Sequence, residues 1–127
     1  MAVQGNLTLN TKVYTPRGRQ PNGPIMQWGL IDTGFGSGFT TVEESVVGPD
    51  AKGAYRAKWK LVVPKLATAD SACACTGGEL GRTTVNIEVV SNSAFTTADL
   101  TDIGLRVKDL VATAPFQVSV NTHEPSW

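Results

Sequence analysis

The sequence predicts an α+β fold in which about five to seven strands precede one amphipathic helix. Two observations lead to this prediction. Apolar and polar side chains alternate along several segments with the period of two that is typical of half-buried strands, and one segment near the end repeats apolar residues at helical spacing. The chain of 127 residues, with 41% hydrophobic and 17% charged residues, has the length and composition of one soluble globular domain.

The clearest strand spans residues 54–65, because its two faces differ in chemistry. One face carries Tyr55, Ala57, Trp59, Leu61 and Val63. The other carries Val62 and three cations that we call the basic ribbon, namely Arg56, Lys58 and Lys60. Residues 51–69 contain five basic residues and no acidic one, although 11 basic and 11 acidic residues balance over the whole chain. Any binding of nucleic acid must therefore depend on this ribbon rather than on net charge.

The N-terminal part of the chain predicts a hairpin and one further strand. Residues 1–15 alternate and contain one or two strands, which the turn-forming residues 15–18 interrupt. Residues 21–24 form a second turn, and residues 25–31 form a short strand. The glycine-rich stretch 33–39 lacks the spacing of a dinucleotide-binding fingerprint, and no helix-forming segment follows it, so a flexible loop is favoured.

The middle of the chain predicts the rest of an antiparallel sheet. Residues 40–47 are rich in β-branched side chains and end at the turn 48–50, so they should pair with residues 54–65. A long loop, residues 66–81, leads to a last strand at 82–90. One face of that strand carries Thr83, Val85, Ile87 and Val89, and the other carries Arg82, Thr84, Asn86 and Glu88.

A helix is predicted over residues 97–114, because Thr96 and Asp99 have the spacing of a capping box and Pro115 follows the segment. Its apolar stripe consists of Leu100, Ile103, Val107, Leu110 and Val111. At about 1.5 Å per residue this helix is too short to cover the apolar face of the sheet. We therefore expect two chains to exchange helices over a shared sheet, with the stripe as the dimer core. The tail comprises residues 115–127, and from Phe116 to Trp127 it alternates more like a strand.

Catalysis, a metal site and a membrane span receive little support. His123 is the only histidine, and no nucleophile has an evident base and orienting partner. Glu43 and Glu44 are adjacent, so on a strand they would point to opposite faces and could not act as an acid and base pair. We expect no enzyme activity, no cofactor and no metal. Residues 1–10 lack a signal-peptide pattern and no apolar run reaches the length of a membrane span, so we expect a cytoplasmic product.

Cys73 and Cys75, in the predicted loop, have several interpretations. With His123 far away they lack the four-ligand spacing of a structural zinc site. A second interpretation is that they are inert thiols in a loop of a cytosolic protein. A bond between the two is disfavoured, because residues two apart in an extended chain lie near the upper limit of disulfide geometry. A bond between neighbouring subunits is geometrically freer.

Four segments in the second half of the chain occur in a specific order and spacing: DAKGAYRAKWKLVVPK, the loop ending CTGGELGR, TTVNIEVVSNS, and a helix ending VKDLVATA. Together they resemble the coat proteins of single-stranded RNA bacteriophages of the levivirus type. AKGAYRAKWKL, the paired cysteines and KDLVATA are most similar to the branch that infects Pseudomonas, whereas VPKLAT and RTTVNIE resemble the coliphage branch. Residues 1–49 match this family only in outline.

The resemblance implies an N-terminal β-hairpin, a five-stranded antiparallel sheet and a C-terminal helix exchanged with a second subunit. Such homodimers join two sheets into one and close into an icosahedral shell around the single-stranded RNA genome. The inner sheet face also binds an RNA hairpin at the replicase start and represses translation. By position, the implied RNA-binding residues are Arg56, Lys58, Lys60, Thr84, Asn86 and Glu88. Glu43 and Glu44 depart from the family pattern, as does the strand-like tail.

Two functions remain possible at the level of sequence. The first is a shell protein, assembled in the bacterial cytoplasm and found in the virion, with Cys73 and Cys75 linking neighbouring subunits. The second is a free dimeric RNA-binding regulator that forms no particles. The basic ribbon itself has a simpler interpretation as the solvated face of a strand. Glu88 either pairs with a lysine across the sheet or accepts a proton from a base amino group.

Overall fold

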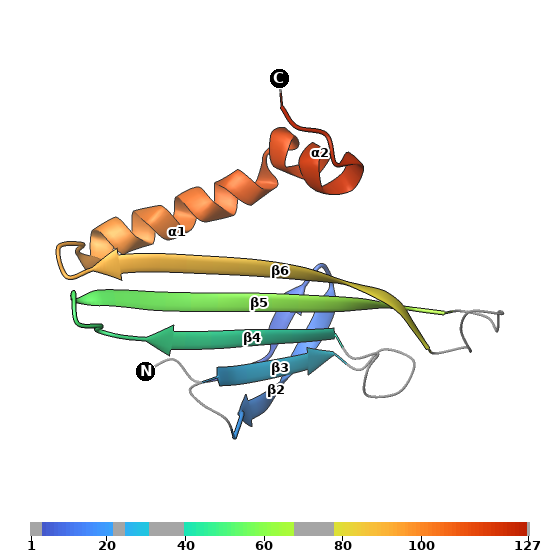
Figure 1. The fold of residues 1–127 in the computed structure, drawn as a ribbon, viewed down its shortest axis with the longest axis horizontal. Helices are drawn as coiled ribbons and strands as arrows, with labels where there is room; N and C mark the ends of the chain where they lie inside the picture. Colours follow the sequence, from blue (N-terminus) through green and yellow to red (C-terminus); the bar gives the residue numbers. More distant parts are fainter. Residues whose placement is uncertain (1–3, 22–24, 31–39, 68–77, 127) are drawn as a thin grey trace. The chain divides into compact units, whose positions relative to one another are not determined.

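The computed structural model describes residues 4–21, 25–30, 40–67 and 78–126. The chain divides into two compact units, Met1–Ser91 and Asn92–Trp127. The first unit is a six-stranded antiparallel sheet in which sequence order and spatial order coincide (Figure 1). Its strands are β1 (Leu7–Leu9), β2 (Lys12–Arg19), β3 (Ile25–Leu30), β4 (Thr40–Val47), β5 (Ala54–Leu66) and β6 (Glu79–Asn92). The second unit contains α1 (Thr97–Ala112) and α2 (Ala114–Thr122). The predicted α+β class is confirmed.

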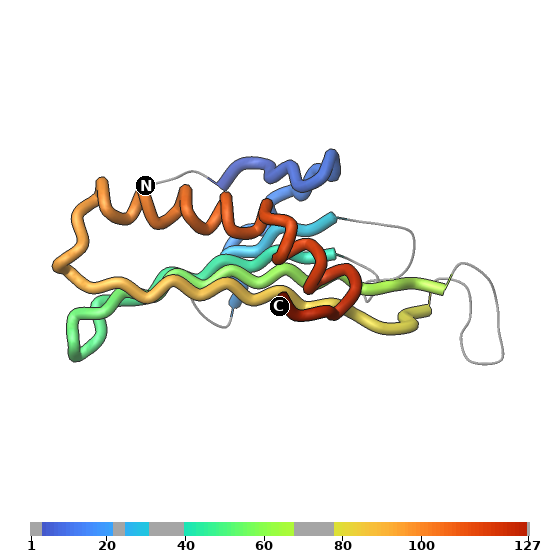
Figure 2. The backbone as a smooth tube through the Cα atoms, turned by 90° about the horizontal axis from the view of Figure 1, so that it is seen from above, coloured from blue at the N-terminus to red at the C-terminus, as the bar shows by residue number. Residues whose placement is uncertain are grey.

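The resemblance implies a hairpin beside a five-stranded sheet, whereas here the hairpin strands β1 and β2 continue into β3 to β6 as one six-stranded sheet. β2 pairs with β1 on one side and with β3 on the other. The predicted pairing of residues 40–47 with the long basic strand is confirmed, and in its register Glu43 lies opposite Lys60 and Ser45 opposite Lys58. Figure 2 shows β4, β5 and β6 following one another as neighbouring strands.

The core of the first unit lies on one face of this sheet, which we call the apolar face. Tyr14, Trp28 and Val42 are buried there, and they pack against partly buried neighbours: Leu7, Met26, Leu30, Trp59 and Leu61. The rings of Trp28 and Trp59 stack with their centroids 5.6 Å apart. The indole Nε1–H of Trp28 donates to the carbonyl oxygen of Gly5 at 2.8 Å, which satisfies the buried ring and holds the N-terminal segment against the sheet.

The predicted turn at residues 15–18 is wrong. β2 continues through this segment, with a register shift between Pro16 and Gly18 that marks a β-bulge. A bulge accommodates the missing N–H of proline, and Gly18 adopts a φ of 75°. The hairpin instead turns at Asn10 and Thr11, whose φ angles are 46° and 66°. Positive φ at both central residues is typical of a tight hairpin turn.

The long strands extend further than their alternation predicts. β5 runs to Leu66 and β6 begins at Glu79, so the connection between them is shorter than the predicted loop 66–81. The N–H of Ala67 donates to the carbonyl oxygen of Gly78 at 2.8 Å, which joins the two sides where the strands end. β6 is the last strand of the sheet within this chain.

The prediction of a strand-like tail is also wrong, because residues 114–122 form α2. Thr113 ends α1 with an extended backbone and at the same time caps α2, since its hydroxyl accepts the N–H of Phe116 at 3.4 Å. Pro115 occupies the first turn of α2, where its missing N–H costs nothing. Neither helix contains a buried residue, and no helix in the described part of the chain is long and apolar enough to cross a membrane.

We expect Thr96→Ala to destabilise α1 by about 1 kcal/mol, because it removes the N-cap. The N–H of Asp99 donates to the Thr96 hydroxyl at 3.3 Å, and the N–H of Thr96 donates to the Asp99 carboxylate at 2.9 Å, so the predicted capping box is present. Thermal unfolding followed by circular dichroism measures the loss. Thr97→Ala, which removes a neighbouring hydroxyl without touching the cap, should cost less. Equal losses would contradict a capping role.

Candidate nucleic-acid interface

The six residues that the resemblance implies for RNA binding lie on two neighbouring strands. β5 carries Arg56, Lys58 and Lys60, and β6 carries Thr84, Asn86 and Glu88. All six side chains are exposed. Their positions alternate with the residues of the apolar face, so they belong to the opposite face of the sheet, which we call the polar face.

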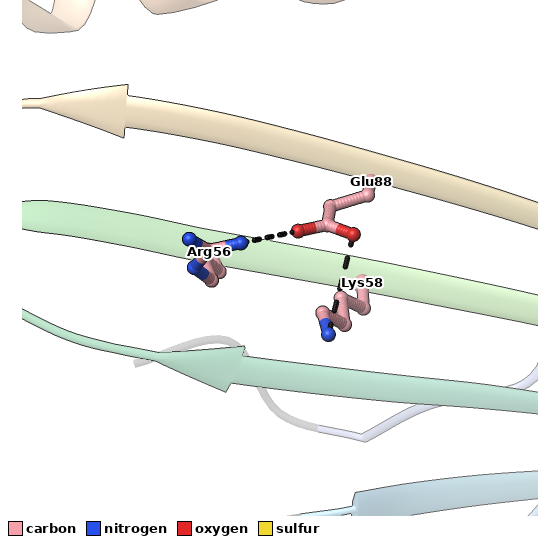
Figure 3. A network of polar contacts seen from close by, with 3 residues as sticks. All are labelled: Arg56, Lys58 and Glu88. Atoms are coloured by element: carbon pink, nitrogen blue, oxygen red, sulfur yellow. Dashed lines mark hydrogen bonds and ion pairs between the residues drawn. The ribbon is translucent and has the colours of Figure 1, made fainter. Parts of the chain in front are cut away.

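Glu88 binds two members of the basic ribbon across the strands (Figure 3). Its Oε1 atom accepts a hydrogen bond from Arg56 Nη1 at 2.9 Å, and its Oε2 atom lies 4.0 Å from Lys58 Nζ. The side chains involved are between 41% and 56% exposed, so water screens these ion pairs and each contributes little to stability. Glu88 therefore lowers the local positive charge, in line with the cross-strand pairing considered from the sequence.

An open groove of about 460 Å³ spans strands β3 to β6. Polar and charged side chains line it together with Ile25, Trp59 and Ile87. The polar and charged members are Glu43, Glu44, Ser45, Lys58, Lys60, Asn86 and Glu88. Arg56 and Thr84 are not among the lining residues, so the structure brings four of the six predicted residues to one concave site. The groove presents ammonium and amide donors beside carboxylate and hydroxyl acceptors. That mixture suits phosphate oxygens and unpaired base edges, the groups by which single-stranded RNA is recognised.

Glu43 and Ser45 are groove residues that the sequence reasoning did not assign to the site. Glu43 lies opposite Lys60 in the register, and its Oε1 atom accepts a hydrogen bond from Gln27 Nε2 at 3.2 Å. Glu44 lies opposite Trp59 and Met26, which belong to the apolar face. The alternation of β4 could have indicated that Glu43 and Ser45 share the polar face, because adjacent residues of a strand point to opposite faces.

Arg82 at the start of β6 is held by a neighbouring carboxylate. Its guanidinium donates to Glu79 at 2.7 and 2.8 Å through two nitrogen atoms. This bidentate pair lowers the pKa of Glu79 and raises that of Arg82. Cys73, Cys75 and the glycine-rich stretch 33–39 lie outside the described residues. Within the described ranges no group of three or more His, Cys, Asp or Glu side chains is placed to hold a metal ion.

No protein-family model and no curated protein matches this sequence. Solved structures do match over nearly the whole chain. A chain of the virus-like particle of bacteriophage ESE058 superposes with a TM-score of 0.84 at 14% identity, covering 99% of this chain and 100% of its own. A chain of the virus-like particle of Beihai levi-like virus 21 gives 0.82 at 18% identity, covering 99% of both chains. The capsid protein of bacteriophage GA gives 0.75 at 16% identity, covering 95% and 96%.

The chain has the fold of the levi-like bacteriophage coat proteins. This match includes the short final helix, so α2, which alternation had suggested to be a strand, is part of a structure shared along the full length. The likeness to the Pseudomonas branch stays a prediction.

We expect Glu88→Gln to strengthen the binding of a labelled single-stranded RNA of mixed sequence by several-fold. The substitution releases Arg56 and Lys58 from their carboxylate partner while keeping its shape. The slope of log affinity against log salt should steepen by roughly 0.7 for each additional phosphate contact. Fluorescence anisotropy measures both quantities. Glu124→Gln, which removes one exposed carboxylate outside the groove, is the matched control. Weaker binding of Glu88→Gln would indicate instead that Glu88 contacts a base directly.

Proposed function

We propose that this protein is the coat protein of a single-stranded RNA bacteriophage, which assembles as dimers into an icosahedral shell around its genome. The main support is the full-length match in fold to chains of two virus-like particles and of a bacteriophage capsid. The virion is then its final location and the bacterial cytoplasm its place of assembly. Binding of a genomic hairpin that represses replicase translation is the finer part of this proposal.

The distribution of apolar side chains supports a second copy as the first partner. On α1, Leu100 is 38% exposed and Leu110 is 59% exposed, while Ile103, Val107 and Val111 are only half-buried. On the sheet, Tyr55, Val63 and Ile87 are 44%, 41% and 40% exposed. Burying a Leu or Ile side chain contributes roughly 1.5–3 kcal/mol, so covering the stripe on α1 alone would contribute on the order of 10 kcal/mol before the costs of association.

The polar face supports RNA as the second partner. Three exposed cations on one strand repel one another unless anions offset them, and Glu88 and Glu43 do so only in part. Phosphates would complete this compensation, with an affinity that falls as salt rises. The groove beside the ribbon adds acceptors and an amide that can discriminate between bases.

Electron microscopy of the purified protein tests the shell, and its ultraviolet absorbance ratio tests for packaged RNA. Closed particles with a nucleic-acid absorbance support the proposal. Soluble dimers that bind RNA and never form particles would favour the free regulator, and the coat-protein assignment would then be wrong.

Replacing Leu110 by Asp should abolish both soluble dimers and particles. The new carboxylate would have to be buried without a partner in the interface between two copies, at a cost of several kcal/mol. Size-exclusion chromatography with light scattering measures the mass. Leu105→Asp on the same helix is the matched control, because Leu105 lies outside the apolar stripe. A well-folded Leu110→Asp monomer would show that the chain does not need the exchanged helix.

Lys58→Glu combined with Lys60→Glu should weaken RNA binding by at least an order of magnitude and flatten its salt dependence, since two phosphate contacts are lost and two repulsions are added. Dimer stability should change little, because both side chains are exposed on the polar face. Lys52→Glu combined with Lys65→Glu makes the same change in charge outside the groove. If the two double variants reduce the affinity for RNA equally, the ribbon acts only through net charge.

A further inference from the structure

Glu44 is a half-buried carboxylate on the apolar face of the sheet. It lies opposite Met26 of β3 and Trp59 of β5, and both of these neighbours pack against the buried core. Glu44 also borders the groove on the polar face, but its two cross-strand neighbours assign its side chain to the apolar face. None of the ion pairs or side-chain hydrogen bonds within the described part of the chain involves its carboxylate. A charge therefore lies unpaired beside the aromatic core.

This carboxylate lines a hollow of about 390 Å³ on the apolar face. The stacked rings of Trp28 and Trp59 also line it, and the N-terminal segment forms another wall. That segment is held in place by two hydrogen bonds. The side-chain amide of Gln4 donates to a main-chain carbonyl oxygen of β3 at 2.8 Å, and the carbonyl oxygen of Gly5 accepts from the Trp28 indole at 2.8 Å. The hollow is therefore already formed in the single chain.

Covering this hollow would make the charge of Glu44 costly. While the apolar face is open, water reaches the carboxylate. When the apolar stripe of a second copy covers the face, water is excluded, and a buried carboxylate without a partner is strongly unfavourable. A helix that covers the face must therefore bring a cation to the hollow.

Lys108 is the cation of α1 that is best placed to reach the hollow. At about 100° of rotation per residue, it lies at one edge of the apolar stripe, beside Val107 and Val111. Its apolar stem can lie along a hydrophobic surface while its ammonium extends to a carboxylate. No ion pair between described residues involves this ammonium. Arg106, the other cation of α1, lies toward the opposite edge and binds Asp102 at 2.7 Å.

We propose that the hollow beside Glu44 receives Lys108 from a second copy of this chain. Two-fold symmetry then forms the same carboxylate–ammonium pair twice in each dimer. The inference rests on the dimer proposed above and names two residues that the resemblance did not indicate. Apolar contacts are non-directional, so the stripe of α1 alone does not fix where the helix lies along the sheet. A buried ion pair at each end would fix it.

Co-expression of two differently tagged variants tests the pair. Glu44→Lys and Lys108→Glu should each fail to form homodimers, because like charges meet at both sites. Together they should form a heterodimer, since both sites then hold opposite charges. Tandem affinity purification isolates the mixed species, and size-exclusion chromatography with light scattering measures its mass. If the mixture yields no heterodimer, the pair does not form between copies and the proposal is wrong.

Arg106→Glu co-expressed with Glu44→Lys is the matched control. It makes the same change in charge on the same helix but toward the other edge of the apolar stripe, so it should restore no dimer. Restoration by Arg106→Glu and not by Lys108→Glu would overturn the assignment of Lys108.

Glu44→Gln keeps the shape of the side chain and separates a paired from an unpaired carboxylate by the sign of its effect. If Lys108 is the partner, the substitution leaves a buried ammonium unpaired and should raise the dissociation constant of the dimer by roughly tenfold or more. If Glu44 has no partner, the substitution removes a buried charge and should tighten the dimer, which would contradict the proposal. Urea unfolding at several protein concentrations gives this constant.

Circular dichroism verifies that each variant is folded. If the wild type dimerises and Glu44→Gln leaves its dissociation constant unchanged, the pair is absent and the coat-protein function stands. If the wild type is a monomer at all concentrations, both proposals fail.

Discussion

The register between β4 and β5 is the constraint on which the rest of the structure depends. It sets Glu43 opposite Lys60 and Ser45 opposite Lys58 on the polar face, and Glu44 opposite Trp59 on the other. A slip by one residue would place Lys58 and Lys60 among the aromatic side chains of the core, where unpaired charges are prohibitively costly. The hydrophobic pattern therefore determines the position of the charges: burying Trp59 against Trp28 leaves the neighbouring lysines exposed and aligned.

The regular parts of the fold were predictable because each had a strong local signal. Alternation located β4, β5 and β6, and the Thr96 and Asp99 pair located the start of α1. The errors fall where the local signal was weak or misleading. The hairpin turn uses Asn10 and Thr11 rather than an Asn-Gly pair, while Pro16 and Gly18, ordinarily turn-forming, are absorbed by a bulge.

The tail illustrates a different limit. Three apolar residues, Phe116, Val118 and Val120, alternate as in a strand, yet the segment is helical. Thr113 and Pro115 were the better signal, because a cap and an N-terminal proline start a new helix directly after the first one ends. At the candidate site, the family resemblance together with strand parity indicated Lys58, Lys60, Asn86 and Glu88, which the structure brings to one groove. The alternation of β4 placed Glu43 on the polar face, but its position opposite Lys60 depends on the register between β4 and β5, which no local pattern contains.

Charge compensation on the polar face reconciles a neutral chain with a cationic ribbon. Glu88 binds Arg56 and approaches Lys58, and Glu43 lies opposite Lys60, so the sheet avoids the full repulsion of three aligned cations. Because these pairs are exposed, they are weak and exchange readily for other anions. RNA bound on this face would compete with carboxylates of the protein itself. Binding would then favour RNA that offers several phosphates and fitting base edges together, and the affinity for isolated phosphates would stay low.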